Sequence, residues 1–144
     1  MTARIQWAKA APDAFNAMLA MEEAVTKSGL DKPLLELVRL RASQINGCAY
    51  CVNMHAEDAR KGGETEARLQ TLGVWRDTDF FTPRERAALA WTESNTKLSQ
   101  QHPSDQEFEA LRQHFSDAEI VNLTLAIATI NAWNRFGVGM ALKP

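Results

Sequence analysis

The chain has 144 residues, which fits one folded domain on a prior of roughly 100–200 residues per domain. Its 16 Lys and Arg residues against 18 Asp and Glu residues leave a net charge of -2, which excludes the basic footprint of a nucleic-acid-binding protein. With 45% hydrophobic and 24% charged residues, the chain is too apolar to be disordered. The longest charge-free apolar stretch, residues 120–134, is shorter than the ~20 residues that span a bilayer. The first 21 residues do not fit a secretory signal, so we expect a cytoplasmic protein with no nucleic-acid or membrane partner.

Helix punctuation recurs along the whole sequence, whereas the alternation typical of strands is nearly absent. Pro12 near a start and Gly29 as a stop predict a first helix over residues 12–28. Asp31 as a cap, with Pro33 in the first turn, predicts a second helix over residues 31–45. The Asn46-Gly47 pair ends that helix, and a third runs from near Cys48 to the glycine pair at 62–63.

The second half of the chain contains a short helix and three capping boxes. Residues 64–72 predict a fourth helix that ends at Gly73, followed by a loop over residues 74–81. Boxes at 82–85, 104–107 and 116–119 open helices that extend to about residues 98, 115 and 136. We therefore predict an all-α fold with a single domain over residues 1–144, whose core spans about residues 12–136.

The predicted last helix is apolar around most of its circumference, and such a helix must be buried. Burial in the centre of the subunit and burial against a second subunit both satisfy this requirement. We expect self-association, since a small domain commonly hides such surface in an oligomer. The four tryptophans are expected to be core or interface anchors.

The two cysteines carry the chemistry of this sequence. They are too few for a secreted disulfide framework, so the pair indicates redox chemistry or metal binding. Cys48, Cys51 and His55 are three and four residues apart in the third helix, so their side chains share one face. A thiol attacks as its thiolate, which a helix N-terminus and a neighbouring imidazole both favour. The sequence thus predicts reactive thiols in the first turn of a helix.

Glu36 lies in the preceding helix, one Asn-Gly break away from the cysteines. An antiparallel helix pair would bring its carboxylate to the thiols or to His55, where it could orient the imidazole or accept a proton. It could also be a solvated surface carboxylate. A zinc site is a further alternative, because Cys48, Cys51, His55 and Glu36 are all ligand types that zinc accepts. In the simplest alternative, the cysteines are buried apolar residues without a chemical role.

The spacing Glu, eleven residues, Cys-x-x-Cys, three residues, His resembles the active-site signature of the AhpD-like alkylhydroperoxidases of the carboxymuconolactone decarboxylase superfamily. The glycine pair at 62–63, the helix that opens at Thr82 and the closing Asn131-Ala132-Trp133-Asn134-Arg135 also look like this family. The resemblance covers roughly residues 12–136. It implies an AhpD-like helical fold that assembles as trimers or hexamers.

The resemblance also implies thiol-dependent reduction of organic hydroperoxides. By position, Cys51 would be the attacking thiol and Cys48 the resolving one, while Glu36 and His55 would relay protons. No organic cofactor would be bound, and an external dithiol such as a lipoylated protein would reduce the disulfide. One residue departs from the pattern: Tyr50 stands where the best-known members have a histidine, and a phenol is not a base at neutral pH.

Two other functions fit the same fold. One is a carboxymuconolactone-type decarboxylase, which needs a general acid and a general base but no cysteine pair. The other is a non-enzymatic helical scaffold or redox sensor whose disulfide changes an interaction. Fold membership alone does not choose between them and the peroxidase.

Overall fold

The structure is a computed structural model that describes residues 3–144, and every regular element among them is helical. The elements in chain order are α1 (Trp7–Ala10), α2 (Pro12–Thr26), α3 (Lys32–Asn46), α4 (Ala49–Lys61), α5 (Glu66–Thr71), the 3₁₀ turn η1 (Leu72–Asp77), α6 (Pro83–Thr96), α7 (Asp105–Arg112) and α8 (Asp117–Gly139). The predicted all-α fold is confirmed. Within the described residues, none of the helices combines the length and the apolar character that a membrane span requires.

Local sequence signals set most of the helix ends. Asp31 caps α3 by accepting the Leu34 N–H at 3.1 Å, as its position predicted. All three predicted capping boxes are present at the starts of α6, α7 and α8. Gly47 ends α3 with φ at +68°, a left-handed conformation that glycine adopts without strain.

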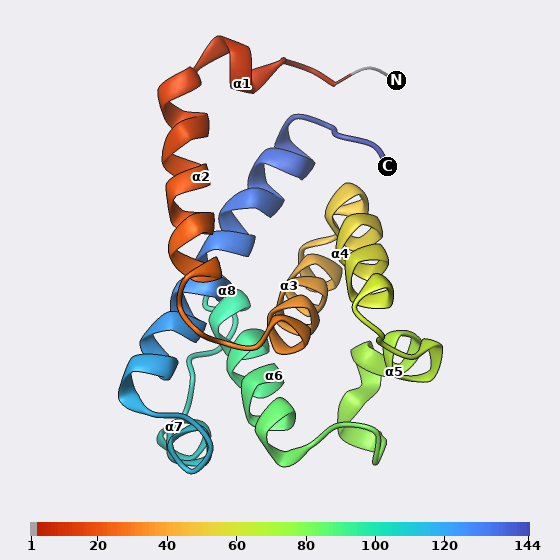
Figure 1. Ribbon diagram of the computed structural model, residues 1–144, viewed down its shortest axis with the longest axis vertical. Helices are drawn as coiled ribbons and strands as arrows, with labels where there is room; N and C mark the ends of the chain where they lie inside the picture. Colours follow the sequence, from red (N-terminus) through yellow and green to blue (C-terminus); the bar gives the residue numbers. More distant parts are fainter. Residues whose placement is uncertain (1–2) are drawn as a thin grey trace.

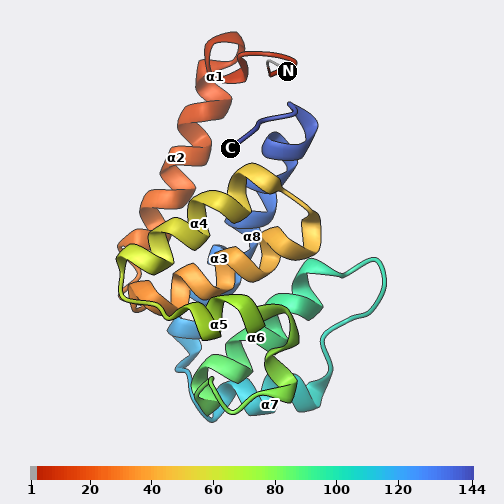
Figure 2. The same ribbon diagram turned by 90° about the vertical axis from the view of Figure 1, so that its right-hand side faces the viewer.

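Helix α8 runs through the middle of the molecule, with α2, α3, α4 and α6 packed around it (Figure 1). One group of buried apolar side chains joins α3, α6 and α8, and a second joins α3, α4, η1 and α6. Both ends of the described chain lie at the same end of the molecule, above the adjacent helices α3 and α4 (Figure 2). The prediction that the last helix is buried is therefore confirmed for the face that these helices cover.

Two segments differ from the prediction. Residues 7–10 form the short helix α1, which no sequence signal indicated, because its Trp7 ring stacks on Phe136 of α8 at a centroid separation of 4.0 Å. Residues 74–77, predicted as loop, belong to the 3₁₀ turn η1. The turn continues past Gly73 because it buries Trp75, whose indole N–H donates to Glu93 at 2.7 Å. Tertiary contacts decide both segments.

Glu93 joins three elements in the half of the molecule away from the termini. Its carboxylate accepts hydrogen bonds from Arg41 at 3.0 Å, from Arg76 at 2.7 Å and from the Trp75 indole. Burial alone would raise the pKa of Glu93, but these donors and the charge of Arg41 outweigh burial and hold the pKa below its usual value. The carboxylate is thus ionised in the folded protein.

A group with a lowered pKa stabilises the fold above its unfolded pKa, and this contribution is lost as the pH falls through the folded pKa. We therefore expect Glu93→Gln to lower the free energy of unfolding by about 3 kcal/mol at pH 7. The difference between wild type and variant should shrink as the pH falls below about 4. Thermal unfolding across this range measures it, with Glu109→Gln as the control because Glu109 is an exposed carboxylate on α7. A difference that stays constant with pH would contradict this role.

Candidate active site

The two cysteines lie at the start of α4, directly after the Gly47 turn. Cys48 is the N-cap residue in an extended conformation, and its Sγ accepts the Cys51 N–H at 3.3 Å. The two sulfurs form a disulfide that closes the first turn of the helix. An N-terminal helix turn favours negative charge, so on reduction this cap stabilises a thiolate at Cys48.

Helix α8 approaches the disulfide at Gly137. A Cβ atom added at this glycine would lie 2.5 Å from Cys48 Sγ and 3.1 Å from Cys51 Sγ. Only a residue without a side chain leaves room for both sulfurs here. Asn134, one turn earlier in α8, accepts a hydrogen bond from Asn46 at 2.9 Å and thereby ties α8 to the end of α3. The last helix therefore forms the wall behind the cysteine pair.

His55 lies one helical turn after Cys51, and its Nδ1 is 2.9 Å from Oε2 of Glu36 on the neighbouring α3. Burial would raise the pKa of Glu36, but the hydrogen bond and charge of His55, together with Arg39, lower it below its usual value. The ionised carboxylate must accept this hydrogen bond, so Nδ1 carries a proton and Nε2 is free to take up another. Glu36 does reach the site, as the helix-pair hypothesis predicted.

A chain of hydrogen bonds extends from Glu36 across two more helices. Arg39, buried on α3, donates to Glu36 at 3.0 Å and also to Glu22 on α2. Glu22 in turn accepts the indole N–H of Trp133 on α8 at 2.9 Å. The carboxylate behind His55 is thus fixed by contacts that involve α2, α3 and α8.

A cavity of about 440 Å³ lies against this chain and against Cys51. Cys51 and His55 both line it, whereas Cys48 does not. Tyr50 and Met54 also line it and are 39% and 37% exposed, so the cavity lining reaches the surface at these residues. The two sulfurs are therefore unequal: a small molecule that enters the cavity meets Cys51, and Cys48 lies behind it.

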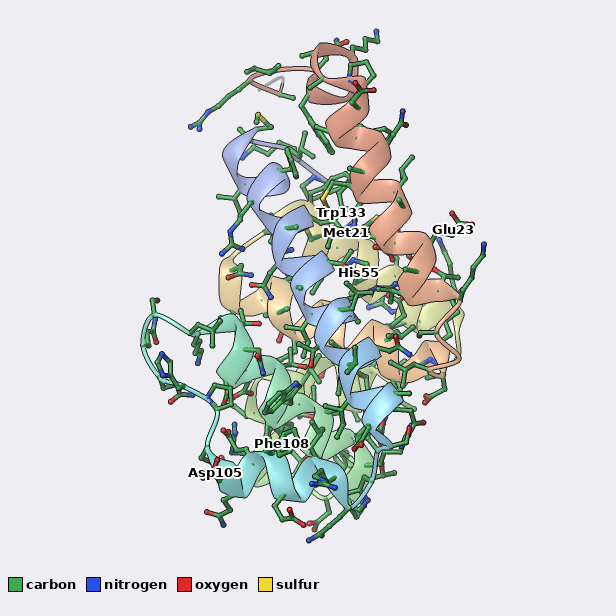
Figure 3. The ribbon with its side chains drawn as sticks, turned by 90° about the vertical axis from the view of Figure 1, so that its left-hand side faces the viewer. Met21, Glu23, His55, Asp105, Phe108 and Trp133 are labelled. Carbon is green, nitrogen blue, oxygen red and sulfur yellow. A yellow bond between two sulfur atoms is a disulfide. The ribbon has the colours of Figure 1, made fainter. Side chains whose placement is uncertain are left out.

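Aromatic rings form part of the cavity wall. Trp7, Phe15, Trp133 and Phe136 pack against one another with centroid separations of 4.0 to 6.3 Å. Figure 3 shows Trp133 and His55 between the ribbons of α2 and α8. Trp7 and Trp133, which we expected to be core or interface anchors, pack within this cluster and also line the cavity.

The residues that could bind a metal ion in the structure differ from the four that the zinc hypothesis named. The two sulfurs are bonded to each other, so neither is a thiolate ligand. Among the described residues, ligand atoms of Glu36, His55 and Asp58 lie within 4.8 Å of one another. A cation there would compete with Arg39, because both oxygens of Glu36 already accept hydrogen bonds.

Sequence reasoning missed Glu22, Arg39 and Gly137. Glu22 and Arg39 are ordinary charged helix residues in the sequence, and only the fold brings them together. Gly137 did carry a signal, because a glycine inside an apolar helix costs stability and needs a packing reason.

Comparison with known proteins places the chain in a recognised group. The sequence model described as Carboxymuconolactone decarboxylase family matches residues 12–94. The uncharacterised protein YdfG of Bacillus subtilis is 38% identical over 140 residues, covering 97% of this chain and 95% of YdfG. A crystal structure is known of a protein of unknown function from Agrobacterium tumefaciens, described as a candidate antioxidant defence protein AhpD. Its sequence is 46% identical to this chain. The structure superposes with a TM-score of 0.95 and covers 99% of both chains.

A more distant structure shares the fold alone. The debrominase Bmp8 is 22% identical and superposes with a TM-score of 0.81, covering 90% of this chain and 70% of its own. Proteins with this fold therefore differ in chemistry, and the function of the present chain has to be argued from its own side chains.

The contact at Gly137 yields a test of the cysteine geometry. Gly137→Ala places a methyl group where the joined sulfurs lie, so we expect the dithiol–disulfide equilibrium to shift toward the dithiol by about tenfold or more. A redox titration against a dithiothreitol buffer, read by thiol alkylation and mass spectrometry, measures this shift. Gly139→Ala is the matched control, because a Cβ atom at Gly139 of the same helix meets nothing within 4 Å. Equal potentials for the two variants would exclude the steric role.

Proposed function

We propose that this chain, which belongs to the carboxymuconolactone decarboxylase family, is a thiol-dependent peroxidase that reduces organic hydroperoxides through the Cys48–Cys51 pair. One observation carries the proposal. Cys51 lines a cavity open to the surface, is bonded to a second cysteine, and shares the cavity with a histidine that a buried carboxylate orients. These are the parts that a peroxide-reducing dithiol needs: a sulfur beside a substrate-sized cavity, a resolving sulfur and a proton donor.

In the first step, Cys51 is the thiol that attacks. His55 Nε2 takes the proton of the Cys51 thiol, and the thiolate attacks the outer oxygen of the hydroperoxide. The O–O bond breaks, the sulfur becomes a sulfenic acid, and His55 returns its proton to the departing alkoxide to give an alcohol. Glu36 holds the imidazole in the tautomer that this transfer requires and stabilises its protonated form.

In the second step, the Cys48 sulfur attacks Cys51, a disulfide forms and the sulfenic oxygen leaves as water. An external dithiol then returns two electrons and two protons. Its thiolate attacks Cys51, the cysteine that lines the cavity, and Cys48 leaves as a thiolate at the helix N-cap. The protein itself binds no organic cofactor in this cycle. A lipoylated protein has the dithiol chemistry that the reductant needs.

The two alternatives are less well supported. A lactone acid, the substrate of a carboxymuconolactone decarboxylase, is an anion, whereas Glu22, Glu36 and Asp58 give the cavity a negative lining. A redox sensor needs no substrate cavity beside its disulfide. A dithiol cycle also needs a reducing compartment, which agrees with a cytoplasmic location.

We also propose that the chain forms a homo-oligomer, a trimer or hexamer. The proposal is supported by the face of α8 that the subunit leaves uncovered, where Val121 is 67% exposed. A groove beside it, between the end of α6 and α8, includes Leu98, Ala128 and Ala132. Burying this surface in an assembly would remove apolar area from water.

The peroxidase mechanism predicts different results for the two cysteine variants. Activity with cumene hydroperoxide and a dithiol should fall to background in both Cys51→Ser and Cys48→Ser. After one equivalent of peroxide without reductant, dimedone should label Cys51 in Cys48→Ser, and Cys51→Ser should take up no label. Mass spectrometry reads both outcomes, and wild type should lose two hydrogens instead. Full activity in either variant would exclude the two-thiol cycle, and labelling at Cys48 would reverse the roles.

Sedimentation tests the assembly. Wild type should sediment at a multiple of its 16.1 kDa, and Ala128→Glu should dissociate it by placing a charge on the uncovered face of α8. Ala110→Glu, on the exposed face of α7, is the control and should leave the mass unchanged. A 16 kDa species alone in the wild-type sample would rule out the oligomer.

A further inference from the structure

We propose that the cavity beside Cys51 selects uncharged, aryl-sized hydroperoxides and rejects carboxylated ones, with Trp7 binding the ring and Glu22 and Asp58 excluding the anion. This inference rests on the proposed function for the identity of the reacting group. It adds the substrate class and the residues that determine it. Two independent features of the cavity lead to it, one aromatic and one electrostatic.

The first feature is the aromatic side of the cavity. The Trp7 ring stacks on the Phe136 ring with an angle of 13° between the two ring planes. It meets the rings of Phe15 and Trp133 edge to face. Such a cluster offers both ring faces and ring edges to a planar guest, and these are the contacts that aromatic rings prefer. The cavity of about 440 Å³ is within the size range of small-molecule sites and is large enough for a substituted benzene ring.

Trp7 is the residue of this cluster that can be replaced with least effect on the main helices. It belongs to the four-residue helix α1, which is held to the end of α8 by the Arg4 N–H on the Met140 carbonyl at 2.9 Å. The Arg4 guanidinium adds a hydrogen bond to the Gly139 carbonyl at 3.1 Å. Trp7 therefore lines the cavity from a helix outside the main bundle. Replacing its side chain should weaken ligand binding while the main helices stay packed.

The second feature is the charge of the cavity lining. Among the described residues that line the cavity, three carboxylates (Glu22, Glu36 and Asp58) stand against the single permanent cation, Arg39. The lining is net negative whether or not His55 carries a proton. A carboxylate that enters the cavity is therefore repelled, and it also loses its hydration shell.

Arg39 does not offset this repulsion, because its guanidinium is already engaged. It donates to Glu36 at 3.0 Å and to Glu22, and its side chain is only 9% exposed. Recruiting Arg39 to a substrate carboxylate would leave Glu22 or Glu36 buried without its partner, which is costly. A neutral substrate leaves the whole chain of ion pairs intact.

A binding experiment on the disulfide form tests the inference without any turnover. The probes are cumyl alcohol, which is the product of cumene hydroperoxide reduction, and its para-carboxamide and para-carboxylic acid. The amide and the acid have nearly the same shape and differ in charge at pH 7. Isothermal titration calorimetry should show the amide binding about tenfold or more tightly than the acid.

Variants assign the effect to residues. Glu22→Gln keeps an acceptor for Trp133 and removes one charge, and Asp58→Asn removes another, so each should reduce the amide-to-acid ratio by about threefold. Trp7→Ala should weaken all three probes and leave the ratio unchanged. Glu109→Gln, an exposed carboxylate on α7, should change neither quantity. Circular dichroism checks that each variant folds, and Asp58→Asn carries the test should Glu22→Gln fail.

Equal binding of amide and acid to the wild type would overturn the inference. So would the failure of all three probes to bind, or a ratio that neither charge variant changes. None of these outcomes depends on peroxidase activity. Discrimination without any peroxidase activity would instead overturn the proposed function and leave the binding preference standing.

Discussion

The site depends on the ion pairs that the buried Arg39 guanidinium forms with two carboxylates. The guanidinium bridges Glu36, which orients His55 on α4, and Glu22, which accepts the Trp133 indole of α8. Four helices are thus linked by one run of charge-assisted hydrogen bonds. Buried charges are costly unless they are paired, and loss of one partner leaves the others uncompensated. The imidazole is therefore held in place by an arrangement that tolerates little change in the packing of α2, α3 and α8.

Sequence reasoning predicted the features that are encoded within a few residues of one another. The capping boxes, the Asp31 cap and the Gly47 turn are local, and each fixes a helix end regardless of the rest of the chain. The face shared by Cys51 and His55 follows from helix geometry alone, as does its place in the first turns of α4. Contact between Glu36 and His55 needed only one further assumption, that the two helices on either side of Gly47 are neighbours.

Features that depend on the packing of distant segments could not be predicted in this way. Nothing near Trp7 in the sequence specifies that it will stack on Phe136, which is 129 residues further along the chain. The pairing of Glu22 with Arg39 likewise depends on how α2 and α3 each pack against α8. These residues build the walls of the cavity, so the sequence indicates the reacting groups much better than it indicates what they react with.

The same division bears on how one fold serves different chemistries. The disulfide and the histidine belong to α4 and Glu36 to α3, whereas the aromatic side of the cavity is supplied by α1, α2 and the end of α8. The side chains of Trp7 and Phe15 can change without altering the cap at Cys48 or the glycine at position 137. Substrate preference can therefore diverge while the cysteine pair is kept. A protein such as Bmp8 can share the helical framework at 22% identity and act as a debrominase.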